Sequence, residues 1–333
     1  MNHTPRRKAL ILIILAVLSL LVLLAAPLTG MKMLPLTTYS SEGGLDHEIL
    51  LNIRIPRVLT AYLVGAALAL SGMAFQAIFR NPLATPFTLG VSSGASLGTA
   101  VFIRLGLTGT LLGIAGLSWA AFLGALFSVT LVYGLTRLKG GFSSATLLLA
   151  GVAVSFFFSS LILFIQYISG FTHSFRILRW LMGSLDVVGY EPVRNILTVV
   201  FIGTVMLLLL TNELNLLLTG EDLAISRGAN ISLIKKLLFV AVSIMVGGVV
   251  AFCGPIGFVG MMAPHICRLL VGSEHRGLLP ATFLFGGVFL TMCDMLSRTL
   301  IAPVEIPVGI ITALLGGPFF IWLLLNRKGR MEL

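Results

Sequence analysis

The sequence predicts an all-α polytopic membrane protein with ten transmembrane helices and both termini in the cytoplasm. Of its 333 residues, 57% are apolar and only 10% are charged, against roughly 25% charged residues in an ordinary soluble protein. That apolar fraction, at roughly 20 residues per span, is enough for about eight to ten crossings of a bilayer. Basic residues also favour alternate loops, as the positive-inside rule requires.

Continuous apolar runs, separated by charged residues, proline or glycine, define the ten candidate spans. The first run follows Arg6, Arg7 and Lys8 and is too long for the apolar region of a secretory signal, so we interpret it as a span. The eighth run is short, because Gly254-Pro255 and Gly272 interrupt helices on either side of it. The ten spans cover residues of about 9–28, 56–79, 84–105, 112–136, 143–168, 192–212, 233–253, 257–271, 278–297 and 306–326.

The distribution of basic residues orients these spans. An even number of crossings puts both termini on one side, and placing that side in the cytoplasm keeps most of the 22 lysines and arginines inside. The net charge of +10 is therefore explained by orientation, and no clustered basic face suggests nucleic acid. Eight basic residues remain outside: Lys32, Arg54, Arg57, Arg104, Arg176, Arg179, Arg194 and Arg298.

The chain has no room for a large extramembrane domain, so residues 1–333 are predicted to form a single transmembrane permease domain. Its longer polar segments are about 29–52 and 169–191 outside and about 213–232 inside. In the inner segment, Gly220 ends one helix, Glu221 and Asp222 start another at its positive end, and Gly228 closes it. So short a helix is not stable alone. It suggests docking into a partner, and an ordinary solvated loop is the alternative.

Two motifs have simpler explanations than chemistry. Gly90-Val91-Ser92-Ser93-Gly94 matches a nucleophile elbow, with His173 or His265 as a possible base, but its context is a membrane helix. Glycines four apart, at 90, 94 and 98 and at 109 and 113, instead indicate close helix packing. Met261, Met262 and His265 are interpreted as packing residues, and the cysteines Cys253, Cys267 and Cys293 as buried thiols. The sequence predicts neither a catalytic residue nor a metal site.

The energy source is expected to lie outside this chain. It contains no Walker A motif, so any ATP that drives it is hydrolysed by another subunit. The carboxylates gather at span ends, whereas proton-coupled carriers usually hold acidic residues in mid-membrane. An ion-coupled secondary transporter is kept as the alternative from a different class, and an intramembrane serine protease as a third.

Several motifs resemble the permease subunits of ATP-binding-cassette importers for ferric siderophores, heme and vitamin B12, the FecCD or BtuC-like type II importers. The resemblance runs from about residue 50 to the end, with the motifs in the family's order. They are Arg54-Ile55-Pro56-Arg57, Arg80-Asn81-Pro82-Leu83-Ala84-Thr85-Pro86, Leu148-Leu149-Ala150-Gly151-Val152, Trp180-Leu181-Met182-Gly183-Ser184-Leu185, Pro264-His265-Ile266-Cys267-Arg268, His275-Arg276-Gly277-Leu278-Leu279-Pro280 and Glu305-Ile306-Pro307-Val308-Gly309.

The resemblance implies a homodimer of ten-helix subunits in the bacterial inner membrane. Its partners would be membrane lipid, two cytoplasmic ATPase subunits that bind ATP and Mg, and a periplasmic binding protein. No cofactor is expected in the chain itself. The cargo implied is an iron(III)-siderophore-type chelate, with heme or vitamin B12 as alternatives, because such a path is bland and selectivity is expected in the binding protein.

The resemblance also implies three groups of site residues. A cytoplasmic gate is expected at the ends of the second and fifth spans, coupling to the ATPase in the inner loop, and docking of the binding protein at external arginines. The gate residues are Asn81, Leu83, Ser143 and Ser144; the coupling residues are Gly220, Glu221, Asp222, Ala224, Arg227 and Gly228; the docking residues are Arg54, Arg57 and Arg298. The arginines could instead be interfacial anchors that extend to lipid headgroups.

Overall fold

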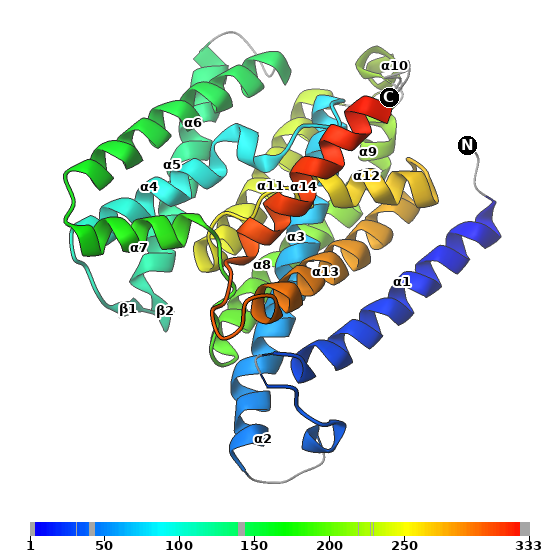
Figure 1. The fold of residues 1–333 in the computed structure, drawn as a ribbon. Helices are drawn as coiled ribbons and strands as arrows, with labels where there is room; N and C mark the ends of the chain where they lie inside the picture. Colours follow the sequence, from blue (N-terminus) through cyan, green and yellow to red (C-terminus); the bar gives the residue numbers. More distant parts are fainter. Residues whose placement is uncertain are drawn as a thin grey trace. The chain divides into compact units, whose positions relative to one another are not determined.

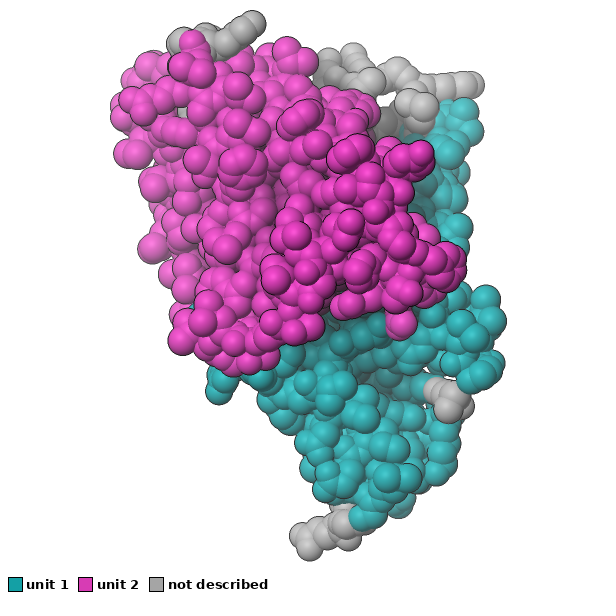
Figure 2. Space-filling model, turned by 90° about the vertical axis from the view of Figure 1, so that its left-hand side faces the viewer, with its two compact units in different colours: residues 1–70, 183–198, 256–333 teal, residues 71–182, 199–255 magenta. Residues whose placement is uncertain are grey.

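A computed structural model of the protein describes residues 4–30, 32–39, 44–138, 144–218, 220–226, 228 and 230–326. These residues form helices and one small hairpin (Figure 1). The chain divides into two compact units, residues 1–70, 183–198 and 256–333 in unit 1, and residues 71–182 and 199–255 in unit 2 (Figure 2). Neither unit is a continuous stretch of sequence, so the division is no boundary between consecutive domains.

Unit 1 is built around the long helix α13 (His275–Thr299). The first helix, α1 (Pro5–Ala25), packs along α13, and α12 (Val259–Val271) packs on it as well. At one end of α1, Nζ of Lys8 donates to Oε2 of Glu274 at 2.8 Å, which lowers the pKa of that carboxyl. The other elements of unit 1 are η1 (Ala26–Leu28), η2 (Leu36–Tyr39), α2 (Leu45–Ile49), the π-helical turn η3 (Leu50–Arg54), α3 (Ile55–Phe79) as far as residue 70, the start of α8 (Glu191–Leu209) and α14 (Val308–Asn326).

Two glycines let α3 cross α13 at very short range. A Cβ added to Gly65 would lie 2.2 Å from the carbonyl oxygen of Gly286, and one added to Gly286 would lie 2.4 Å from Cβ of Ala69. Because lipid offers no hydrophobic drive for helices to associate, such close backbone contact is a main source of their attraction. The crossing therefore holds the start of α3 firmly in unit 1.

Unit 2 has its tightest packing between α4 (Val91–Arg104) and α5 (Gly116–Leu138). An added Cβ at Gly94 would lie 2.4 Å from the carbonyl oxygen of Gly124, and one at Gly98 would lie 2.1 Å from that of Ala120. The remaining elements are η4 (Pro86–Leu89), the strands β1 (Thr110–Leu111) and β2 (Ile114–Ala115), α6 (Ser144–Tyr167), α7 (Phe171–Leu181), the rest of α8, α9 (Thr211–Leu218), α10 (Glu221–Ser226) and α11 (Ile231–Cys253).

The glycine pattern was interpreted correctly for α4 and wrongly for the next pair. Gly94 and Gly98 do pack against a neighbouring helix, whereas Gly113 lies in the turn between β1 and β2, and Gly109 comes just before β1. Leu112 and Gly113 both have positive φ, 55° and 79°, as a two-residue type I′ hairpin turn requires. A spacing of four residues cannot distinguish a helix contact from a turn.

Each of the ten predicted spans contains one helix. Seven helical stretches among the described residues are long and apolar enough to cross a membrane. Of the three others, α4 and α12 have only 14 and 13 residues, and the apolar stretch counted in α14 is Val308–Leu323. α4 is short because η4 and Gly90 (φ 80°) precede it. The breaks predicted around the eighth span are confirmed, since α11 ends at Cys253 and Gly272 closes α12. The count of ten crossings and the side of the termini stay predictions.

Candidate functional site

A cluster of four charged side chains, three of them buried, lies at one end of unit 1. Nε of Arg57 donates to Oδ1 of Asp294 at 3.0 Å, and Nη2 of Arg57 lies 3.0 Å from the same oxygen. Nη1 of Arg57 donates to Oε2 of Glu305 at 2.7 Å. Nε of Arg298 lies 3.0 Å from Oδ2 of Asp294. We call Arg57, Asp294, Arg298 and Glu305 the arginine–carboxylate cluster.

Three elements bring the cluster together. Arg57 lies in the first turn of α3, and Asp294 and Arg298 stand four residues apart in α13, on the same face of the helix. Glu305 lies in the loop between α13 and α14, which is fixed beside α13 because the amide of Ile306 donates to the carbonyl of Ser297 at 3.1 Å. The crossing of α3 and α13 thus sets the distance between Arg57 and Asp294.

The four side chains differ sharply in their access to solvent. The Asp294 side chain is 0% exposed and that of Arg298 5%, while the Glu305 side chain is 46% exposed. A buried charge needs a paired partner, because its desolvation is otherwise very costly. Asp294 therefore acts as the fixed counter-ion of both arginines. Asp186, 47% exposed, lies 4.0 Å from Nη1 of Arg57, too far for a hydrogen bond.

The arginines also hold the segment that follows α1. Nη1 of Arg298 donates to the carbonyl of Thr29 at 3.0 Å, and Nη1 of Arg54 donates to the carbonyls of Pro27 and Leu28, both at 3.2 Å. Nη2 of Arg54 adds a 2.7 Å bond to the carbonyl of Lys32. All three arginines predicted to dock a partner thus have acceptors within their own chain.

This pairing was missed at the level of sequence. The sequence analysis assigned these external arginines to a docking partner or to lipid headgroups, whereas Asp294 and Glu305 of the same chain pair with Arg57. The spacing of Asp294 and Arg298 was the available signal. The residues predicted outside meet at the end of α1 near Thr29, and Lys8 and Glu274, predicted inside, meet at its opposite end. A docking role for the arginines stays a prediction.

The predicted coupling segment contains two short helices. α9 covers Thr211–Leu218 and α10 covers Glu221–Ser226, with Gly220 (φ 107°) between them. The structure buries Ala224 completely, while Leu223 and Ile225 are 55% and 60% exposed. Ala224 therefore contacts its own chain rather than a partner, and its two neighbours offer the outward apolar surface. Arg227 and the side chains of Glu221 and Asp222 lie outside the described part.

The predicted gate begins with a tight turn after α3. Oδ1 of Asn81 accepts the amide N–H of Leu83 at 2.9 Å, and the Leu83 side chain is 55% exposed. η4 then packs against α6 at Gly151, where an added Cβ would lie 2.6 Å from Cα of Leu89. Ser144 starts α6, but its side chain and all of Ser143 lie outside the described residues.

The gate turn and the coupling segment are neighbours within unit 2. Arg80 has a positive φ of 47°, and a Cβ added to Gly220 would lie 4.0 Å from its Nη1. The turn that carries Asn81 and Leu83 therefore lies beside the turn that leads into α10.

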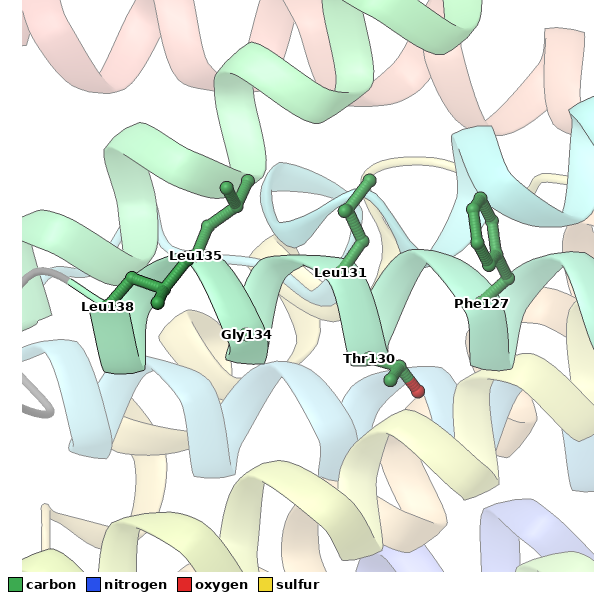
Figure 3. A pocket seen from close by; sticks show the side chains of 6 residues that line it. All are labelled: Phe127, Thr130, Leu131, Gly134, Leu135 and Leu138. Atoms are coloured by element: carbon green, nitrogen blue, oxygen red, sulfur yellow. The ribbon is translucent and has the colours of Figure 1, made fainter.

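One pocket of about 310 Å³ lies along α5 (Figure 3). Its lining is apolar apart from Thr130, and that hydroxyl already donates to the carbonyl of Leu126. Phe127, Leu131 and Leu135 point the same way from the helix in Figure 3. The surface suits hydrocarbon and offers no group to bind a polar chelate.

The residues considered for other chemistry do not form a site in the described structure. No group of three His, Cys, Asp or Glu that could hold a metal ion occurs among the residues searched. His265 packs edge-on against Phe319, with ring centroids 6.2 Å apart. The Gly90–Gly94 motif follows the 3₁₀ helix η4 instead of a strand, so it does not form a nucleophile elbow. The three cysteines are free and buried, as predicted.

Comparison with known proteins gives a consistent result over nearly the whole chain. The chain is 42% identical over 282 residues to the cobalamin import system permease protein BtuC of Halobacterium salinarum, covering 84% of this chain and 73% of that one. It is 39% identical over 317 residues to the hemin transport system permease protein HmuU of Yersinia pestis, with 93% and 94% covered.

A solved structure agrees with these relatives. A metal-chelate type ABC transporter in an inward-facing conformation matches with a TM-score of 0.85 and 34% identity, over 95% of this chain and 99% of that one. The model of the FecCD transport family matches residues 11–326. The chain therefore belongs to the FecCD transport family and is the membrane-embedded permease subunit of an ABC importer, in which a separate subunit hydrolyses ATP.

Proposed function

We propose that this permease moves an iron(III)-siderophore-type chelate across the bacterial inner membrane into the cytoplasm. The observation that carries the proposal is the 0.85 TM-score to a metal-chelate type ABC transporter over 95% of the chain. Heme and vitamin B12 are the alternatives, because relatives named for hemin and for cobalamin transport are 39% and 42% identical.

Uptake by the reconstituted importer tests the cargo. Proteoliposomes would hold the permease, its ATPase and its binding protein, and would be offered a radioactive ferric siderophore, heme or cobalamin in separate runs. We expect the ferric siderophore to accumulate only with ATP inside and the binding protein outside. Preferential uptake of heme or cobalamin would show that the proposed cargo is wrong and that the protein still works as an importer.

ATP bound with Mg by two partner subunits is the proposed energy source, and α10 is the proposed contact with them. Its exposed Leu223 and Ile225 could enter an apolar cleft, whereas exposed apolar side chains on a solvated loop would gain nothing.

The alternative of ion coupling is weakened by the environment of Asp294. This buried carboxylate is already paired with two guanidinium groups of its own chain, which gives it a structural role. Uptake driven by a proton gradient without the ATPase would overturn the proposal.

The chelate is proposed to pass between two copies of the chain. Several large apolar side chains of α6 are exposed, among them Phe156 at 73% and Phe157 at 58%. Lipid covers such a surface readily, and so does a second subunit. The second argument for a homodimer is the size of the cargo, because a chelate needs a wider path than the described pocket along α5 provides. The cytoplasmic end of this path is proposed to close at Asn81, Leu83, Ser143 and Ser144.

A periplasmic binding protein is proposed to deliver the chelate at Arg54, Arg57 and Arg298. Arg54 and Arg298 both hold the segment after α1, and Arg298 shares Asp294 with Arg57, so the three guanidinium groups lie in one region of unit 1. Acidic side chains are the chemistry that such a site recognises, through charge-assisted hydrogen bonds.

A further inference from the structure

The arginine–carboxylate cluster has an unequal pair of acidic members. Asp294 receives Nε of Arg57 and contacts Nε of Arg298, with no exposed side-chain surface. Glu305 receives only Nη1 of Arg57, from a loop, and 46% of its side chain is exposed. One carboxylate is thus buried between two guanidinium groups, and the other contacts one guanidinium group and is half-exposed.

This inequality gives the two acids different costs of removal. Separating Asp294 from the arginines would leave a buried charge without a partner, which is strongly destabilising. Moving the half-exposed Glu305 into water breaks one ion pair only, because Asp294 still pairs with Nε and Nη2 of Arg57. An incoming carboxylate that reached Nη1 of Arg57 would therefore displace Glu305 and leave Asp294 in place.

We propose that Glu305 is an exchangeable internal ligand of Arg57, and that a carboxylate of the docking protein replaces it when the two proteins bind. The inference rests on the proposed docking at the arginines and adds the mechanism of contact. Asp294 acts as a positioning residue: it holds the guanidinium groups of Arg57 and Arg298 so that Nη1 of Arg57, whose side chain is 10% exposed, points to the half-exposed Glu305.

The exchange changes what a charge-neutralising substitution should do. In the free permease Glu305 pairs with Arg57, and in the complex the carboxylate of the partner takes its place. Glu305→Gln removes the competing charge from the free state only, so binding becomes tighter. From the value of an exposed ion pair, the dissociation constant should fall by about 1.5- to 5-fold. In a model where Glu305 stays on Arg57 in the complex, the same change gives no such gain.

A matched control separates competition from general attraction. Glu48→Gln removes one negative charge from α2 in the same unit, where Glu48 accepts a hydrogen bond from Nδ2 of Asn52. Both variants lose the same long-range repulsion of an acidic partner. The difference between them therefore measures the local exchange.

Salt gives a second signature of the exchange. In the wild type, one ion pair is broken and one is formed, so binding should depend weakly on ionic strength. In Glu305→Gln, a pair is formed with none broken, so the dissociation constant should rise more steeply with salt. The advantage of this variant over wild type should shrink as salt increases.

The experiment measures dissociation constants for the importer's own binding protein and the permease–ATPase complex in lipid nanodiscs, over a salt series. We expect Glu305→Gln to bind more tightly than both wild type and Glu48→Gln, and to lose this gain when Arg57→Lys is added. Equal constants for Glu305→Gln and Glu48→Gln would overturn the exchange. If Arg54→Gln and Arg57→Lys both bind as wild type, docking at the arginines is wrong and the exchange falls with it.

Discussion

Nε of Arg57 donates a 3.0 Å hydrogen bond to Oδ1 of Asp294, although the two residues lie 237 positions apart in the chain. The bond joins the start of α3 to α13, about two helical turns from the point where Gly65 and Gly286 bring the two helices into backbone contact. Packing and charge thus support one another: the close crossing sets the separation of the charges, and the buried pair needs that crossing to keep it paired.

Loss of either partner of this pair should destabilise the protein strongly. Asp294→Leu leaves two buried guanidinium groups without their counter-ion, and the expected cost is about 3 to 5 kcal/mol. Arg57→Met has a smaller cost, because Arg298 still faces Asp294. The double variant should lose less than the sum of the singles, by about 0.5 to 3 kcal/mol. Unfolding of the purified variants in detergent would measure this, and simple additivity would contradict direct coupling of the pair.

The glycine crossing of α3 and α13 predicts a second stability effect. Gly65→Ala puts a methyl group where the carbonyl oxygen of Gly286 would lie only 2.2 Å away, so the helices must separate. We expect a loss of about 1 to 3 kcal/mol, as for other overpacked sites. Gly277→Ala in the first turn of α13 is the control, because a Cβ there meets nothing within 4 Å. That variant should be neutral or slightly stabilised by better helix propensity.

The sequence predicted the helices well because each needs only its own apolar run and the glycine or proline that ends it. For that reason α11 ends at Cys253, directly before Gly254 and Pro255, and α12 ends directly before Gly272. The partners of Arg57 could not be predicted in the same way, because the contact depends on how α3 crosses α13. The interpretation of Gly113 was wrong for a related reason. The hairpin turn needs a residue with positive φ at this position, and the spacing of glycines does not reveal φ.

The coupling proposal predicts a loss of assembly from substitutions on the exposed side of α10. Leu223→Asp and Ile225→Asp place charge where an apolar cleft of the ATPase is expected, so less ATPase should co-purify and uptake should fall at least tenfold. Leu112→Asp is the control, because this residue is 85% exposed in the hairpin turn that follows α4, and Arg104 at the end of α4 is predicted to lie outside. Normal ATPase recovery with both α10 variants would show that α10 is not the contact.

Ala224 gives an internal comparison for the same helix. The residue is fully buried, so a large charged side chain there would disturb the packing of the segment itself. Ala224→Glu should therefore lower the stability of the permease on its own, with or without the ATPase. Leu223→Asp should leave the unfolding temperature of the isolated permease nearly unchanged. A comparison of thermal unfolding for the two variants separates damage to the fold from loss of the partner.

The gate proposal predicts a cross-link between two copies of the chain. The starting variant replaces the three native cysteines with alanine, which is expected to be tolerated because all three are free and buried small side chains. In that background Ser143→Cys and Ser144→Cys should each form a disulfide across the dimer axis, and the link should block uptake until it is reduced.

Leu83→Cys should cross-link or be protected from bulky thiol reagents in the same nucleotide state, because Leu83 is exposed in the single chain and becomes covered only when the gate closes. Thr110→Cys in the hairpin is the control and should stay unlinked and reactive throughout. If Cys at 143 and 144 never cross-links and reacts freely in every nucleotide state, the path closes elsewhere, and the turn at Asn81 and Leu83 serves only to end α3.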